Sequence, residues 1–168
     1  MRPENCQLAE YEAWFESECN KLTLDPGFSV VGPFIAPRGI PGFPPWHSDF
    51  AIIYPDHMYI RVAEYYEESS QLYRICGYRR YFAYHYGKCS DQRDEDGFPC
   101  RIKAVNLRIE QDNKNGCHAH HLNPNHIPQS RLPGLDFDRI DPFEFIRAVD
   151  EHRRSLRPLH EILGFNWS

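Results

Sequence analysis

Apolar residues recur at three- and four-residue steps over residues 3–22, and this spacing predicts an amphipathic helix with its stripe on Leu8, Tyr11, Phe15, Cys19 and Leu22. A turn is predicted directly after it, at Asp25-Pro26-Gly27. Five prolines follow between residues 30 and 46. Because proline donates no backbone hydrogen bond, this segment is predicted to be an ordered, extended connection and neither a helix nor a central strand.

From residue 49 the pattern becomes that of β-strands. A short apolar run covers residues 50–54, alternation of apolar and polar residues covers 57–65, and longer strand-like stretches cover 72–86 and 101–110. We expect residues 72–86 to pair antiparallel with 101–110, because only a polar loop separates them. Residues 111–135 contain Asn, Gly, His and Pro throughout and are predicted to be a loop.

A second helix is predicted to begin after Asp141, which is a good N-cap residue. Pro142 suits the first helical position, and Glu144 can complete a capping box. Pro158 is expected to end or kink this helix. The predicted fold class is α+β: an antiparallel β-meander of about four strands with an N-terminal helix and a C-terminal helix packed on the sheet. We expect a single domain over residues 1–168, in which 1–48 hold the first helix and the proline-rich connection, and 49–156 hold the sheet, the histidine-rich loop and the last helix.

Composition narrows the class of protein. The 168 residues include 19 Lys and Arg against 24 Asp and Glu, a net charge of -5, so any contact with nucleic acid must be local. No run of 18 apolar residues and no signal-like N-terminus is present, so we expect a cytoplasmic protein with no membrane partner. In that compartment the six cysteines are expected to be reduced, and a Cys89–Cys100 disulfide is the less favoured alternative.

Histidines are concentrated after the last predicted strand, where four of nine consecutive residues are histidine: His118, His120, His121 and His126. Imidazoles at short spacing suit a metal site. Two imidazoles also suit RNA cleavage, because one takes a proton from the 2′-hydroxyl and the other gives one to the leaving oxygen. A solvated histidine-rich loop without function is the third alternative. The zinc-protease motif H-E-x-x-H is absent from the sequence.

Arginines and tyrosines alternate along the strands between residues 73 and 108. Basic and aromatic side chains on one sheet face are typical of an RNA platform, whereas packing in an ordinary strand is the alternative interpretation. Arg108 and Arg131 bracket the histidine segment, and either could bind a phosphate or pair with Asp112 or Asp136.

The order of these motifs is similar to that of the TumE-like toxin family of prokaryotic toxin–antitoxin modules. The resemblance covers about residues 49–152. It is carried by the strand Tyr84-His85-Tyr86, by Arg108, and by the histidines His120, His121 and His126. An insertion between Arg108 and Asp112-Asn113 departs from the family pattern. The resemblance implies a small cytoplasmic toxin that acts on RNA and is silenced by an antitoxin with a helix-turn-helix DNA-binding fold.

Together these patterns predict a metal-independent, ribonuclease-like toxin without a cofactor. His120 and His121 are the expected acid and base, with Arg108 stabilising the phosphate and His85 assisting; substrate-binding residues are expected to be Tyr84, Arg80, Tyr86 and Arg131. The first alternative is a zinc-dependent enzyme or zinc-binding protein that uses His118, His120 and His126. The second alternative is a non-enzymatic, phage- or defence-related module that binds a protein partner.

Overall fold

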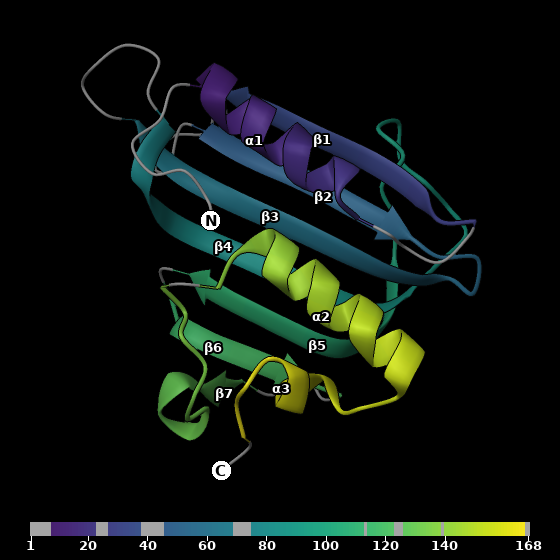
Figure 1. The fold of residues 1–168 in the computed structure, drawn as a ribbon, viewed down its shortest axis with the longest axis vertical. Helices are drawn as coiled ribbons and strands as arrows, with labels where there is room; N and C mark the ends of the chain where they lie inside the picture. Colours follow the sequence, from purple (N-terminus) through teal and green to yellow (C-terminus); the bar gives the residue numbers. More distant parts are fainter. Residues whose placement is uncertain are drawn as a thin grey trace.

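The structure, a computed structural model, describes residues 8–22, 27–37, 46–68, 75–112, 114–122, 126–138 and 140–166; the side chains of 8–9, 35–37, 46–47, 66–68 and 75–81 lie outside this description. Two longer helices, α1 (Leu8–Asn20) and α2 (Pro142–Ser155), lie on one face of a sheet, and the short α3 (Leu159–Ile162) follows α2 (Figure 1). The predicted α+β class is therefore confirmed.

The described residues form one seven-stranded sheet in which the strands lie side by side in chain order. Each strand pairs antiparallel with the next. The strands are β1 (Ser29–Pro37), β2 (Trp46–Ile53), β3 (Met58–Glu68), β4 (Ile75–Cys89), β5 (Ile102–Asp112), β6 (Gly116–His121) and β7 (Ile127–Pro128). The meander is confirmed, but the predicted number of about four strands is wrong.

The predicted antiparallel pairing of residues 72–86 with 101–110 is confirmed for residues 82–86. β4 and β5 pair from Phe82 opposite Gln111 to Cys89 opposite Ile102. Residues 72–74 lie outside the described residues. The polar loop between the two strands turns the chain back, as its sequence indicates.

β1 is the first strand missed by the sequence analysis, because it lies within the proline-rich segment. It pairs with β2 along one edge of the sheet, and its register shifts between Val31 and Phe34. Proline is tolerated in an edge strand, because the N–H groups that point away from the sheet have no neighbouring strand to bind. A β-bulge accommodates the shift in register. The expectation of an extended connection is therefore replaced by an edge strand for residues 29–37, while 38–45 lie outside the described residues.

β6 and β7 are the other missed strands, and they replace part of the loop predicted for residues 111–135. In β6, Ala119 packs in the core while His118 and His120 point to the opposite face. This is a half-buried strand in which histidine occupies the positions where alternation needs a polar residue. The prediction of a loop was wrong because the abundance of His and Asn in this segment hid a period of two.

The hydrophobic core fills the space between the helices and the sheet face that they cover, which we call the helix face. Phe15 of α1 packs edge-to-face against Phe50 of β2 and Phe143 of α2, with ring centroids 5.3 and 4.8 Å apart. The predicted stripe of the first helix is seen in Tyr11 and Phe15, which are buried, although the helix begins at Leu8 and residues 3–7 lie outside the described residues. The other face of the sheet, which we call the open face, carries a smaller apolar cluster of Ile53, Tyr59, Cys89 and Val31 together with the polar residues described below.

The N-terminus of α2 is capped as the sequence predicts. The Asp141 carboxylate accepts a hydrogen bond of 2.8 Å from the Glu144 backbone N–H, and Pro142 occupies the first turn. Leu156 ends the helix in a left-handed conformation, two residues before the proline expected to stop it.

Replacing Asp141 by Ala is expected to lower the free energy of unfolding by about 1 kcal/mol, because an N-terminal N–H then loses its acceptor. Denaturant unfolding of Asp141→Ala beside Asp138→Ala, an exposed aspartate outside the helix, measures this. Equal stability of the two variants would show that the cap contributes nothing.

Four cysteines are described, namely Cys19, Cys89, Cys100 and Cys117, and all four are free thiols, so Cys89 and Cys100 form no disulfide. Cys6 and the side chain of Cys76 lie outside the described residues, so the expectation of six reduced cysteines stays a prediction. Within the described part of the chain, no helix is long and apolar enough to span a bilayer.

Candidate functional site

Four polar side chains occupy directly opposed positions on neighbouring strands of the open face. In the strand register, Arg61 of β3 faces His85 of β4, His85 faces Arg108 of β5, and Arg108 faces His120 of β6. We call these four residues the cross-strand row. Since opposed residues in a sheet point to the same side, the row brings together side chains that are up to 59 positions apart in sequence (residues 61 to 120).

A histidine cluster lies at the β6 end of this row and consists of His118, His120 and His126. One ring nitrogen from each of the three lies within 4.8 Å of the other two. The His118 and His126 rings are stacked 4.6 Å apart, and His120 meets His126 edge-on at 4.6 Å. His118 and His120 are 1% and 9% exposed, whereas His126 is exposed. Among the three histidines, His126 is therefore the one most open to solvent.

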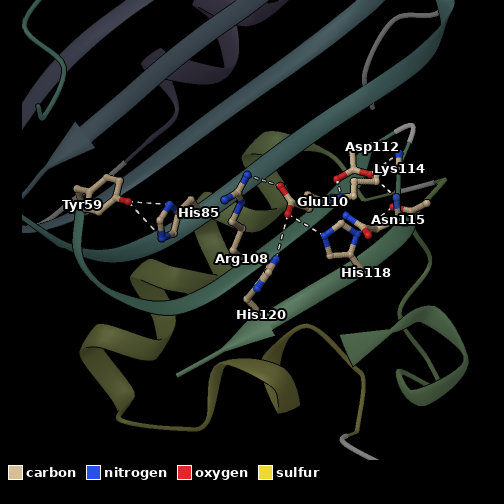
Figure 2. A network of polar contacts seen from close by, with 10 residues as sticks. Tyr59, His85, Arg108, Glu110, Asp112, Lys114, Asn115, His118 and His120 are labelled. Atoms are coloured by element: carbon tan, nitrogen blue, oxygen red, sulfur yellow. Dashed lines mark hydrogen bonds and ion pairs between the residues drawn. The ribbon is translucent and has the colours of Figure 1, made fainter. Parts of the chain in front are cut away.

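Glu110 is the carboxylate that connects the histidine cluster to the cross-strand row (Figure 2). Its Oε1 atom lies 2.8 Å from His118 Nε2 and 3.1 Å from His120 Nε2. Its Oε2 atom accepts from the Arg108 guanidinium. One carboxylate oxygen thus faces the histidines while the arginine holds the other, and the side chain is fixed between them.

Both ring nitrogens of His118 face oxygen atoms. Nδ1 lies 3.0 Å from the Gly116 carbonyl oxygen, and Nε2 lies 2.8 Å from Glu110 Oε1. A neutral imidazole has only one N–H, so one of these contacts needs either a second proton or a metal ion. Metal-ligating histidines commonly donate their other N–H to a backbone carbonyl, which is the contact that Gly116 provides. The arrangement therefore fits a cation bound at His118 Nε2, with the Glu110 carboxylate beside the ion.

The spacing of the three histidines also fits zinc. Zinc–nitrogen bonds of 2.0–2.1 Å in a tetrahedron place the nitrogens about 3.4 Å apart, which is compatible with three ring nitrogens that all lie within 4.8 Å of one another. A second group of donor atoms, from Glu110, Asp112 and His118, is equally compact. However, the Asp112 carboxylate already accepts hydrogen bonds from the backbone N–H groups of Lys114 and Asn115, in the turn between β5 and β6. The three histidines are therefore the better ligand set.

His85 occupies the middle of the cross-strand row and is held neutral. Burial, together with the charges of Arg108 and Arg61 and the nearby His120, lowers its pKa to about 3. Its Nδ1 lies 2.7 Å from the Tyr59 hydroxyl, whose own pKa burial raises. A neutral His85 at working pH contributes hydrogen bonding and positioning rather than positive charge.

His121 lies on the other side of β6 from His120. Neighbouring residues of a strand point to opposite faces, so the structure does not bring the expected acid–base pair together. On the helix face, His121 lines a cavity of about 290 Å³ with Tyr86, His152 and His160. Burial and the neighbouring His160 lower the pKa of His121.

Two of the expected substrate-binding residues, Tyr84 and Tyr86, lie on the helix face and not on the open face. Tyr84 and Tyr86 are buried in the core beneath the helices, and Tyr84 donates to the buried Glu64. Arg131 is exposed in the short helix η1 (Gln129–Arg131). The side chain of Arg80 lies outside the described residues. The structure therefore assembles His85, Arg108 and His120 from the predicted set, with His118 and His126 from the zinc alternative.

Sequence reasoning missed three members of this assembly, namely Glu110, Tyr59 and Arg61. Alternation along β5 does place Glu110 two residues from Arg108, on the same face, so that signal was present. Arg61 and Tyr59 join the site only through the pairing of β3 with β4, which no local pattern reveals.

Comparison with known proteins adds nothing to this description, because no family model, no curated protein and no solved structure matches the chain. The resemblance to the TumE-like toxin family accordingly stays a prediction.

Proposed function

We propose that this protein is a zinc-dependent hydrolase whose metal is held by His118, His120 and His126. The observation that supports this most is the convergence of three imidazoles beside the Glu110 carboxylate, with both ring nitrogens of His118 facing oxygen atoms. Three histidine ligands leave a fourth position open, which is the pattern of catalytic rather than structural zinc sites.

The surrounding residues have distinct tasks in this proposal. Zinc bound there would act as a Lewis acid and lower the pKa of a water molecule at the open position to about 7. Glu110 Oε1 is placed to accept the proton of the attacking water, and Arg108 holds the carboxylate in that orientation through Oε2. His118 is oriented by its contact with Gly116.

Zinc is expected to raise the free energy of unfolding of the parent protein by about 2.7 kcal/mol when free zinc is 100 times its dissociation constant. In His126→Ala this stabilisation should be lost, while the metal-free stability changes by less than about 0.5 kcal/mol because His126 is exposed. Denaturant unfolding with and without zinc measures both quantities.

His57→Ala is the matched control, because His57 is an exposed histidine at the opposite end of the sheet, in the turn between β2 and β3. It should keep the full zinc effect. If His126→Ala and His57→Ala are stabilised equally by zinc, His126 is not a ligand.

A second candidate function, metal-free cleavage of RNA by a toxin, is favoured by the cross-strand row, which places His85, Arg108 and His120 side by side. The partner expected for such a toxin is an antitoxin with a helix-turn-helix fold. The sequence-based form of this account uses His120 and His121 as base and acid, although their side chains point to opposite faces of β6, and it expects alanine at either position to abolish activity.

The two candidates differ in their response to substitution and to a chelator. The zinc account predicts that His120→Ala loses zinc and that His121→Ala retains it, because the two side chains point to opposite faces. It also predicts that any RNA cleavage stops when zinc is chelated. Cleavage that continues in a chelator, and is lost equally in both variants, would favour the metal-free mechanism.

A further inference from the structure

We infer that the substrate of the zinc centre is a single strand of nucleic acid that lies along the cross-strand row, with its phosphates contacting Arg108 and Arg61. The inference rests on the proposed function for its reaction and extends it by naming the class of substrate. It also assigns a role to Arg61, a residue that no sequence motif singles out.

The direction of the row is the first argument. The row crosses β3, β4, β5 and β6 at right angles to the strands, and neighbouring strands lie about 4.8 Å apart. The backbone positions of Arg61 and Arg108 are therefore about 10 Å apart across the sheet, and that of His120 lies about 5 Å beyond Arg108. An extended polymer with repeated phosphates can reach the metal centre and both arginines at once, whereas a phosphate monomer at the centre reaches only Arg108.

The second argument is that each of the two arginines is paired with a carboxylate and is still partly exposed. Arg61 donates to both oxygens of Asp49, at 2.9 Å from Nε and 2.5 Å from Nη2, and its guanidinium lies 4.5 Å from the Phe98 ring centre. Arg108 is held by Glu110. The two side chains are nevertheless 38% and 40% exposed. A guanidinium that is fixed along one edge loses little further entropy when its remaining N–H groups bind a phosphate oxygen.

The charge along the row is the third argument. Asp49 and Glu110 each neutralise their own arginine, and His85 between the arginines is neutral, so the row carries no net negative charge of its own. A zinc ion at one end adds a charge of +2 and makes that end the strongest attractor of anions. This explains how a protein with a net charge of -5 can bind a polyanion locally.

The test uses the zinc-loaded full chain and two kinds of substrate: bis(p-nitrophenyl) phosphate, which is too short to reach Arg61, and fluorescent eight-residue oligouridylate and oligodeoxythymidylate. In Arg61→Gln, zinc content and hydrolysis of the short diester should match the parent. KM for the oligonucleotide that is cleaved should rise roughly 10-fold, since one charged hydrogen-bonded contact is lost. The slope of log affinity against log salt should fall by about 0.7.

Arg157→Gln is the matched control, because Arg157 is also paired with a carboxylate, that of Glu151, and is 55% exposed, but follows α2 and lies outside the row. It should leave zinc content, hydrolysis of the short diester, KM for the oligonucleotide and the salt dependence of affinity unchanged. Arg61→Lys keeps the charge but not the two-pronged contact with Asp49, and it should raise KM by a smaller factor. Melting curves of the Arg61 variants establish that any change arises in folded protein, and if Arg61→Gln is unfolded, Arg61→Lys decides.

The outcomes separate the inference from the function on which it rests. A rise in KM in Arg61→Gln with either oligonucleotide supports a phosphodiester strand as the substrate. Cleavage of oligouridylate but not of oligodeoxythymidylate identifies that strand as RNA. If zinc binds and the short diester is hydrolysed, but Arg61→Gln behaves like Arg157→Gln on both oligonucleotides, the inference is wrong and the proposed function stands. If zinc does not bind and neither substrate is hydrolysed, the proposed function itself fails.

Discussion

Glu110→Gln is expected to retain zinc but to hydrolyse substrate about 100- to 10,000-fold more slowly, which is the usual cost of losing a general base. The amide has the shape of the carboxylate and keeps an oxygen that can accept from Arg108, so packing at this buried position is preserved. What the amide cannot do is accept and release a proton near neutral pH. The effect should therefore appear in kcat, and both zinc content and melting temperature are measured alongside it.

Glu151→Gln provides the comparison for this variant. Glu151 is a glutamate paired with an arginine, as Glu110 is, but it lies in α2 at the surface. It should hydrolyse substrate at the parental rate. Two results would refute the role assigned to Glu110: a parental rate in Glu110→Gln, or loss of zinc together with the rate, which would make the carboxylate a ligand rather than a base.

The second large effect is expected in the dependence of stability on pH, and it arises from His85. Burial and the charges of Arg108 and Arg61 lower its pKa to about 3 in the folded chain, whereas an unfolded histidine titrates near 6.5. The unfolded chain therefore binds a proton over this interval that the folded chain does not. The contribution of neutral His85 to the free energy of unfolding is fully present above pH 6.5. It falls by up to about 1.4 kcal/mol per pH unit as the pH drops toward 3.

The His85 contribution is isolated by comparing His85→Gln with the parent in a chelator, using denaturant unfolding between pH 4 and 7. The variant lacks the titrating imidazole, so its stability should decline less steeply with falling pH. His57→Gln, which changes an exposed histidine, should keep the parental slope. Parallel curves for His85→Gln and the parent would mean that His85 does not stay neutral in the fold.

The elements that could be predicted from sequence are those whose signals are local. The capping box at Asp141 identified the start of α2, and the alternation around Tyr84 and Leu107 identified β4 and β5 as partners. β1 was missed because proline normally argues against a strand. An edge strand is an exception, but the sequence alone does not show that residues 29–37 lie at the edge of the sheet. β6 was missed because its polar positions are histidines, which suggested a loop.

The residues of the candidate site also fall into two groups: those that local motifs reveal and those that only the strand register brings together. His85, Arg108 and the three clustered histidines could be named because they are concentrated around a few motifs. The pairing of His120 with His121 was expected from their adjacency, yet adjacency in a strand separates side chains by placing them on opposite faces. Glu110 and Arg61 gain their partners from strand register, and register is set by the long-range packing of the helix face rather than by residues near them.

The most direct test of the zinc centre is elemental analysis of the full chain after it has been loaded with zinc and passed through a desalting column, in parallel with His126→Ala and His57→Ala. We expect one zinc ion per chain in the parent and in His57→Ala, and a content near zero in His126→Ala. A parent protein that retains no zinc, or a His126→Ala variant that retains as much as the parent, would contradict the proposed metal site.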